Sequence, residues 1–246
     1  STCEGGGRAA LAEALAASNA SLAIWGRKEA ANTAAVDALS KLGSGEVKAW
    51  AVDVSDEQAV VDATADVVSS LGRIDSCFAN AGVGFGAPSF VEMTTEIWRK
   101  NMAVNLDGAF WTLRESVKHM TERAKAGDPG GSVVGVASLA GIEGAARNQA
   151  YAATKGGLPS MIRGIAAECG RYGIRANSIL PGWIATDMTE LAQDNDVFTT
   201  KVITRVPIRR WGEPADFGGM AVYLASDASR YHSGTTCIID GGYAIF

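Results

Sequence analysis

The sequence predicts an α/β fold in which helices cover both faces of a parallel sheet. Short β-rich runs alternate with longer helical patterns, and this alternation is typical of parallel sheets. The strand candidates are continuous apolar runs, as in Val133 to Ala137. Strands that are buried on both faces have this character. No internal repeat or interdomain linker interrupts the 246 residues, so we expect one domain over residues 1–246.

The predicted elements can be placed along the chain from these two patterns. The runs with strand character are Ala20–Trp25, Val47–Val52, Ile74–Ala79, Ser132–Ala137, Ile174–Leu180 and Thr235–Ile239. The helical stretches are Arg8–Ala17, Lys28–Leu42, Asp56–Leu71, Thr94–Ala124, Gln149–Gly170 and Pro214–Ala225.

The chain opens in a glycine-rich stretch, Glu4-Gly-Gly-Gly-Arg8. In a dinucleotide-binding fold such a loop follows the first strand, which is central in the sheet. A sheet without that strand would expose two neighbouring strand edges. We therefore expect roughly ten to fifteen residues, a strand plus a short tail, to precede Ser1 in the natural protein.

Composition and charge exclude several classes of protein. The net charge is −5 and no basic stripe is present, which argues against nucleic-acid binding. The longest apolar runs are strand-sized, so we expect no membrane span. The sequence shows no signal peptide, and we expect a cytoplasmic protein. The four widely spaced cysteines indicate free thiols rather than a metal site or disulfides: Cys3, Cys77, Cys169 and Cys237.

The first candidate cofactor contact is the glycine stretch itself. Gly5, Gly6 and Gly7 precede an amphipathic helical pattern. Glycines let the backbone approach a pyrophosphate, which then lies on the helix N-terminus. A flexible loop is the equally common alternative.

The turn after the predicted strand Ala20–Trp25 should face the adenosine ribose. Gly26 offers no carboxylate there, and Arg27 offers a planar cation suited to a 2′-phosphate. This favours NADP(H) over NAD(H). A solvated arginine at a helix start is the alternative, and the negative charge of Glu4 argues against NADP.

Two short motifs end the next two strands. Asp53 lies where a carboxylate could accept a hydrogen bond from adenine, although Asp53 or Ser55 could instead cap the following helix. Asn80-Ala81-Gly82 offers small residues against which a cofactor could lie, although an ordinary Asn-Gly turn is the alternative.

Tyr151 and Lys155 are the strongest local signal. Their spacing of four places both side chains on one helix face. A nearby ammonium, joined by a cationic nicotinamide ring, would lower the pKa of the phenol from about 10 toward the working range. Ser138, at the end of a predicted strand, could face this helix and hold a substrate oxygen.

Taken together, the motifs identify a family resemblance that covers nearly the whole chain. The chain resembles the short-chain dehydrogenases/reductases, including 3-oxoacyl-carrier-protein reductases and sugar or polyol dehydrogenases. The matching pieces, in order, are Gly5-Gly-Gly7, Asp53-Val54, Asn80-Ala81-Gly82, Asn105, Ser138, Tyr151 with Lys155, Arg175-Ala-Asn177, Pro181-Gly182 and Asp240-Gly-Gly242.

The resemblance implies roles for the catalytic residues. Ser138 would polarise the carbonyl oxygen, and Tyr151 would exchange the proton. Lys155 would bind the nicotinamide ribose and lower the pKa of Tyr151, and Asn105 would hold a water molecule that links Lys155 to solvent. The nicotinamide would be lined by Pro181, Gly182, Ile184 and Thr186.

The resemblance also implies an architecture and an activity. The fold would be a Rossmann-like, doubly wound, seven-stranded parallel sheet, usually assembled as a homotetramer, with a substrate lid at about residues 187–205. We expect an NADP(H)-dependent oxidoreductase for a small carbonyl or alcohol substrate. An NAD-dependent sugar or polyol dehydrogenase, a 3-oxoacyl-carrier-protein reductase and a non-catalytic dinucleotide-binding protein are the alternatives. The glycine stretch departs from the family pattern, because Gly6 replaces an isoleucine.

Overall fold

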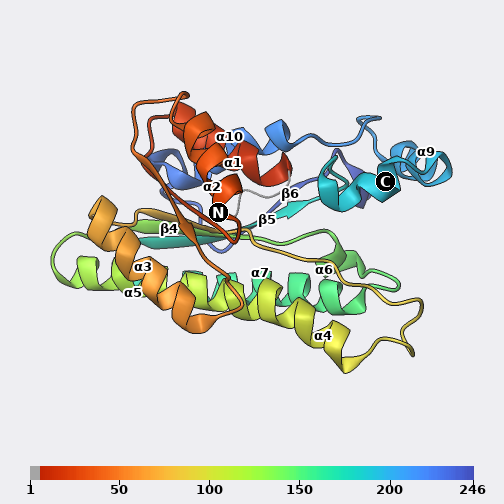
Figure 1. Cartoon of the computed structure of the whole chain (residues 1–246), viewed down its shortest axis with the longest axis horizontal. Coiled ribbons are helices and arrows are strands. Elements are labelled where there is room, and N and C mark those ends of the chain that lie inside the picture. The colour runs from red at the N-terminus through yellow and green to blue at the C-terminus, as the bar shows by residue number, and fades with distance from the viewer. Residues whose placement is uncertain (1–5) are drawn as a thin grey trace. The chain divides into compact units, whose positions relative to one another are not determined.

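A computed structural model describes residues 6–246, which form two compact units. Unit 1 comprises residues 6–51, Leu180–Tyr223 and Ile238–Phe246. Unit 2 comprises Val52–Ile179 and Leu224–Cys237. The element order and the two units can be followed by colour in Figure 1.

Unit 1 begins with two helices and a pair of parallel strands. These elements are α1 (Gly6–Ala17), β1 (Leu22–Gly26), α2 (Glu29–Leu39) and β2 (Val47–Ala51). Strand β1 pairs with β2 in parallel, with Leu22 opposite Val47. Ala12, Ala16, Ile24 and Leu39 join Leu22 in a buried apolar cluster. Each fully buried Leu or Ile contributes about 1.5–3 kcal/mol to folding, so this cluster fixes both helices on the strand pair.

The later part of unit 1 consists of short helices. They are η3 (Asp187–Thr189), α8 (Glu190–Gln193), α9 (Asp196–Arg205), η4 (Pro214–Phe217), α10 (Gly218–Ala225), which continues into unit 2, and η6 (Tyr243–Ile245). Trp183 holds α9 in place, because its ring meets Phe198 edge-on with centroids 5.1 Å apart. Trp183 also contacts Trp211 and Tyr243 edge-on, at 5.9 and 6.5 Å between centroids.

Unit 2 is built on parallel strands with long helices. The elements are α3 (Glu57–Leu71), β3 (Ser76–Ala79), α4 (Thr95–Met102), η1 (Ala103–Asp107), α5 (Gly108–Lys125), β4 (Gly131–Val136), α6 (Ala140–Glu143), α7 (Gln149–Cys169), η2 (Gly170–Tyr172), β5 (Ile174–Pro181), η5 (Asp227–Ser229) and β6 (Thr236–Ile239). The last residues of β5 and β6 belong to unit 1. The sheet order is β3-β4-β5-β6, and β4 pairs in parallel with both β3 and β5. Helices α5 and α7 pack on β4, as Figure 1 shows.

The predicted helix Thr94–Ala124 is interrupted. Thr94 caps its start by accepting a hydrogen bond from the Ile97 N–H at 3.2 Å. The five residues Ala103–Asp107 then form a π-helical turn between α4 and α5. Short π turns inside α-helices are frequent at functional sites. This one carries Asn105.

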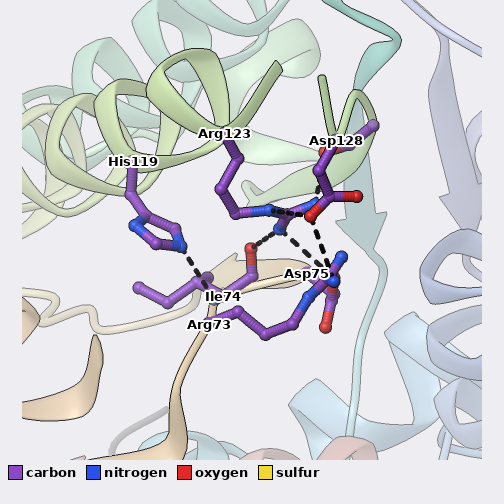
Figure 2. Close-up of polar contacts among 7 residues, drawn as sticks. Arg73, Ile74, Asp75, His119, Arg123 and Asp128 are labelled. Carbon is purple, nitrogen blue, oxygen red and sulfur yellow. Dashed lines mark hydrogen bonds and ion pairs between the residues drawn. The ribbon is translucent and has the colours of Figure 1, made fainter. Parts of the chain in front are cut away.

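A charged cluster joins α5 to the segment before β3 (Figure 2). Arg123 donates to the Ile74 carbonyl at 2.9 Å and pairs with Asp75 and Asp128 at 3.3 and 3.0 Å. The Nε2 atom of His119 accepts a hydrogen bond from the Ile74 N–H at 3.3 Å. Burial and the nearby Arg123 lower the pKa of His119, so its neutral form is favoured.

All six predicted strands are confirmed, with boundaries that differ by two residues at most. The six predicted helices are also present, although Pro214–Ala225 begins as a 3-10 turn and Lys28–Leu42 ends three residues early. Residues 6–246 thus contain six strands, in sheets of two and four, rather than the seven that the resemblance implies.

Three of the predicted free thiols are confirmed. Cys77, Cys169 and Cys237 are free, and burial raises the pKa of each thiol. Cys3 lies outside the described residues. In residues 6–246, no cluster of three or more His, Cys, Asp or Glu side chains could hold a metal ion. Nor does any helix of this part of the chain have the length and hydropathy of a membrane span.

Candidate active site

Tyr151 and Lys155 lie one turn apart on α7, in unit 2. The Lys155 Nζ atom lies 5.6 Å from the centre of the Tyr151 ring. Lys155 is buried, with 4% of its surface exposed, and its Nζ donates to the Val136 carbonyl at 2.9 Å. A buried ammonium needs such partners, because desolvation is costly for a charge. The expected helix face is therefore confirmed, and the last residue of β4 anchors the cation.

Ser138 lies next to this helix face. It follows β4 directly, and its Oγ accepts a hydrogen bond from the Ala140 N–H at 3.2 Å. The short helix α6 then packs against α7 so closely that a Cβ on Gly141 would lie 2.4 Å from the Lys155 carbonyl oxygen. Only glycine fits at this crossing. Ser138 also lies near enough to Tyr151 for its hydroxyl to lower the pKa of the phenol.

The acidity of Tyr151 differs from the expectation. Burial raises the pKa of the phenol above its usual 10, and the hydrogen bond with Ser138 opposes this by lowering it. The pKa is raised on balance. The predicted lowering therefore does not arise in the protein by itself, because desolvation outweighs the stabilisation of the phenolate.

Asn105 is buried in the π-helical turn and is fully engaged with the protein. Its Oδ1 accepts from the Val83 N–H at 2.7 Å, and its Nδ2 donates to the Val83 carbonyl at 2.8 Å and to Thr154 Oγ1 at 3.2 Å. Thr154 lies between Tyr151 and Lys155 on α7 and is completely buried. The side chain of Asn105 thus ties the segment after β3 to the helix that carries the candidate catalytic pair.

Asn101 has a matching role that the sequence reasoning missed. Its Oδ1 accepts from the Phe85 N–H at 3.2 Å, and its Nδ2 donates to the carbonyls of Phe85 and Ile97, both at 2.9 Å. Asn101 and Asn105 are four residues apart and fix the backbone of Val83 and Phe85. The sequence feature that could have indicated this role is the spacing of four between two asparagines in one predicted helix.

The Asn80-Ala81-Gly82 segment has no regular secondary structure and forms no turn, so the alternative of an Asn-Gly turn is wrong. The Asn80 Nδ2 atom is buried and has no hydrogen-bond acceptor among the described residues. A Cβ built on Gly82 would lie 3.4 Å from Lys155 Nζ and 3.5 Å from Asn105 Oδ1. The space over Gly82 is therefore bordered by two of the predicted catalytic residues.

Asp53 and Val54 follow β2. Both Asp53 and Ser55 were candidates to cap α3, and this alternative is wrong, because Asp56 is the cap and accepts from two backbone N–H groups. Asp53 instead accepts from the backbone and side chain of Ser55, at 2.9 and 2.6 Å. The exposed carboxylate of Asp53 follows the strand end, and Val54 is buried.

The glycine stretch lies partly outside the described residues. Gly5 is not among them, and Gly6 and Gly7 form the first turn of α1 rather than a loop. The expectation of a loop at Gly6 and Gly7 is therefore wrong. The first turn of a helix has free backbone N–H groups, which can bind an anion.

The end of β1 explains the absence of an acidic residue there. Asn32 donates to the carbonyls of Gly26 and Trp50 at 3.0 and 3.1 Å, and a Cβ on Gly26 would lie only 2.3 Å from Asn32 Oδ1. A side chain at position 26 would therefore have to displace the Asn32 side chain and its two hydrogen bonds. Arg27 is exposed and forms no ion pair with a described residue.

The predicted nicotinamide contacts lie in unit 1. Pro181 ends β5, and Gly182 allows the backbone to pass Asp240, where a Cβ would be 2.6 Å from Asp240 Cβ. Ile184 is buried, and its backbone pairs with Gly212. The Thr186 N–H donates to Thr189 Oγ1 at 3.1 Å at the start of η3. The predicted lid region contains η3, α8 and α9, with Met188, Leu191 and Val197 exposed.

Comparison with known proteins gives relatives that are named as dehydrogenases and reductases. A sequence family described as enoyl-(acyl carrier protein) reductase matches residues 7–244. An L-rhamnose 1-dehydrogenase (NAD(P)(+)) of Azotobacter vinelandii is 35% identical over 200 residues, which cover 80% of this chain and 75% of the relative.

Solved structures agree with this result. A protein of Agrobacterium tumefaciens assigned as a gluconate dehydrogenase is 34% identical, with a TM-score of 0.92 over 98% of this chain and 92% of that one. A second one from this organism, assigned as a 2-deoxy-D-gluconate 3-dehydrogenase and solved with bound NADP, is 30% identical, with a TM-score of 0.87 over 98% and 93% of the two chains. The predicted Rossmann-like fold is thereby confirmed.

Proposed function

Because this chain belongs to the short-chain dehydrogenase/reductase family, whose members act as oxidoreductases on CH–OH and C=O groups, we propose that it interconverts a ketone and a secondary alcohol with NADP(H). Tyr151 exchanges the proton with the substrate oxygen. The observation that supports this most directly is the position of the Tyr151 ring, 5.6 Å from the buried Lys155 ammonium, with Ser138 near enough to lower the pKa of Tyr151.

In the reductive direction, the Ser138 hydroxyl donates a hydrogen bond to the carbonyl oxygen and polarises it. Tyr151 then donates its phenolic proton as negative charge develops on that oxygen. Burial raises the pKa of Tyr151, so the phenol is protonated at neutral pH and ready to act as a donor. In the oxidative direction Tyr151 must accept the proton, which requires the phenolate.

The chain has groups that fit a nicotinamide dinucleotide. The buried Asn80 Nδ2 lacks an acceptor among the described residues, and Gly82 places no side chain between the backbone and Lys155 Nζ. When bound, the cofactor supplies the hydride, and its oxidised ring adds a positive charge that favours the phenolate. Lys155 would hold the nicotinamide ribose, and the first turn of α1 would contact the pyrophosphate.

The preference for NADP(H) is supported by Arg27. Its guanidinium is exposed at the end of β1, where Gly26 offers no carboxylate. A guanidinium matches the geometry of a phosphate dianion. NAD(H) is the alternative, and the rhamnose dehydrogenase relative carries a name that includes both cofactors.

A sugar-type substrate is the second candidate, favoured by the names of the relatives.

A panel of ketones and secondary alcohols, with simple, polyhydroxylated and 3-oxoacyl members, tests the proposal by NADPH and NADH absorbance. We expect turnover of at least one carbonyl, with a higher kcat/KM for NADPH. No turnover of any substrate with either cofactor would contradict the proposed activity. Equal kcat/KM values for NADPH and NADH would contradict the role of Arg27.

A further inference from the structure

Asn148 is a residue whose side chain makes no hydrogen bond with residues 6–246. It occupies the N-cap position of α7, where asparagine is among the best caps, yet its side chain caps no backbone N–H. Its backbone, at φ −135° and ψ 37°, is not that of a regular helix start. Its Oδ1 atom is buried without a hydrogen-bond donor among the described residues.

The chain around Asn148 is held in an unusual conformation. Arg147, just before it, is in the left-handed region with φ 66°, which is unfavourable for a residue other than glycine or asparagine. The Ala87 N–H donates to the Arg147 carbonyl at 2.8 Å. A Cβ on Gly86 would lie 2.8 Å from that same oxygen, so the two backbones are in close contact. The loop after β3 thus fixes the position of Asn148.

Asn148 and Tyr151 border the same space. A Cβ built on Gly84 would lie 3.6 Å from Asn148 Nδ2 and 4.0 Å from Tyr151 Cδ2. Gly84 itself is exposed, and its neighbours Val83 and Phe85 are fixed by Asn105 and Asn101. The Asn148 amide therefore lies beside the ring of the proposed proton donor, over an open glycine.

A buried acceptor without a donor is unfavourable until a ligand supplies one. The carbonyl that Tyr151 and Ser138 polarise can only accept, so a substrate that pairs with Asn148 Oδ1 needs a second group that donates. A hydroxyl both donates and accepts, and the Asn148 amide offers one group of each kind.

We propose that Asn148 is a specificity-determining residue that binds a hydroxyl on the carbon next to the reacting carbonyl. The preferred substrates are then α-hydroxyketones and the corresponding vicinal diols. The inference rests on the proposed function, because it takes Tyr151 as the proton donor.

The test compares two ketones that differ by one hydroxyl, 1-hydroxy-2-butanone and 2-butanone, by the ratio of their kcat/KM values with NADPH. The hydroxyl also alters the intrinsic reactivity of the carbonyl, but this contribution cancels when the ratio is compared between proteins. We expect Asn148→Leu to reduce the preference for the hydroxyketone by about tenfold or more.

Gln149→Leu is the matched control. Its Oε1 is likewise buried without a donor among the described residues, but Gln149 does not border Gly84. This variant should keep the wild-type ratio. An equal ratio in wild type and Asn148→Leu, or an equal loss in both variants, would overturn the proposal. Thermal unfolding of each variant confirms that it is folded.

A second measurement separates this inference from the activity. Both ketones are titrated by saturation-transfer NMR against NADPH-bound Tyr151→Phe and against the double variant with Asn148→Leu. We expect the hydroxyketone to bind more tightly than 2-butanone only when Asn148 is present. Equal affinities in both proteins would reject the role of Asn148, whereas absence of turnover by the wild type would reject the proposed function alone.

Discussion

The Lys155 ammonium lies 5.6 Å from the centre of the Tyr151 ring and donates a hydrogen bond to the Val136 carbonyl. The cation is therefore fixed by the end of β4 as well as by its own helix. Burial of the phenol raises the pKa of Tyr151 and outweighs the opposing effect of Ser138. The protein by itself thus favours the protonated phenol.

This balance predicts opposite pH dependences for the two reaction directions. Reduction needs the phenol, so kcat/KM for a ketone should be constant at neutral pH and fall at alkaline pH. Oxidation needs the phenolate, so kcat/KM for the alcohol should rise with pH. Initial rates from pH 6 to 10 in both directions check this. An oxidation rate that falls as pH increases would contradict the assignment.

Gly82→Ala tests whether a cofactor occupies the space beside Lys155. The new methyl group would make only ordinary contacts with the protein, at 3.4 Å or more, so thermal stability should be nearly unchanged. We expect NADPH affinity to fall by about tenfold or more, because overpacking costs about 1–3 kcal/mol. Fluorescence titration with NADPH measures the effect, and wild-type affinity would exclude a cofactor from this space.

Gly86→Ala serves as the contrasting variant. Its Cβ would lie 2.8 Å from the Arg147 carbonyl oxygen, so the backbone has to move. We expect a loss of about 1–3 kcal/mol in the free energy of unfolding. Urea denaturation measures the free energy of unfolding of both glycine variants. Equal stability of Gly82→Ala and Gly86→Ala would contradict the close approach of Gly86 to the Arg147 carbonyl oxygen.

Arg27→Ala tests cofactor selection. Removing the guanidinium should reduce kcat/KM for NADPH by about 10–100-fold, because a hydrogen bond to a charged group contributes about 1.5–3 kcal/mol. The value for NADH should be unaffected, since NADH has no 2′-phosphate. Parallel assays with both cofactors give the answer, and an equal loss for both would assign Arg27 a structural role.

His119 predicts a pH-dependent contribution to stability. Its pKa is lower in the folded protein than its usual 6.5, so the unfolded chain binds the proton more readily. The contribution is complete above about pH 6.5 and is lost as pH falls through the folded pKa. The melting temperature of the wild type should therefore fall more between pH 7.5 and 5.5 than that of His119→Gln. An equal fall in melting temperature for the two proteins would contradict the contribution of His119.

Elements with strong periodic patterns could be predicted from the sequence. The strands were found because buried parallel strands are continuous apolar runs, and Tyr151 and Lys155 were paired because helix geometry brings residues four apart together. The π-helical turn around Asn105 could not be predicted, since its pattern is that of a continuous helix.

Features that depend on tertiary contacts were missed or wrong. The hydrogen bonds of Asn101 with Phe85 depend on a loop whose path is set by packing. Asp56 rather than Asp53 caps α3 because the helix begins three residues further along the chain. The direction of the Tyr151 pKa shift depends on burial, which spacing along a helix does not reveal.

The central claim is that Tyr151 exchanges the proton with the substrate, and Tyr151→Phe tests it most directly. This variant keeps the ring beside Lys155 and removes only the hydroxyl. With a ketone that the wild type reduces, kcat should fall by about 100-fold or more, while NADPH binds with unchanged affinity in a fluorescence titration. A Phe variant that turns over at the wild-type rate would contradict the account.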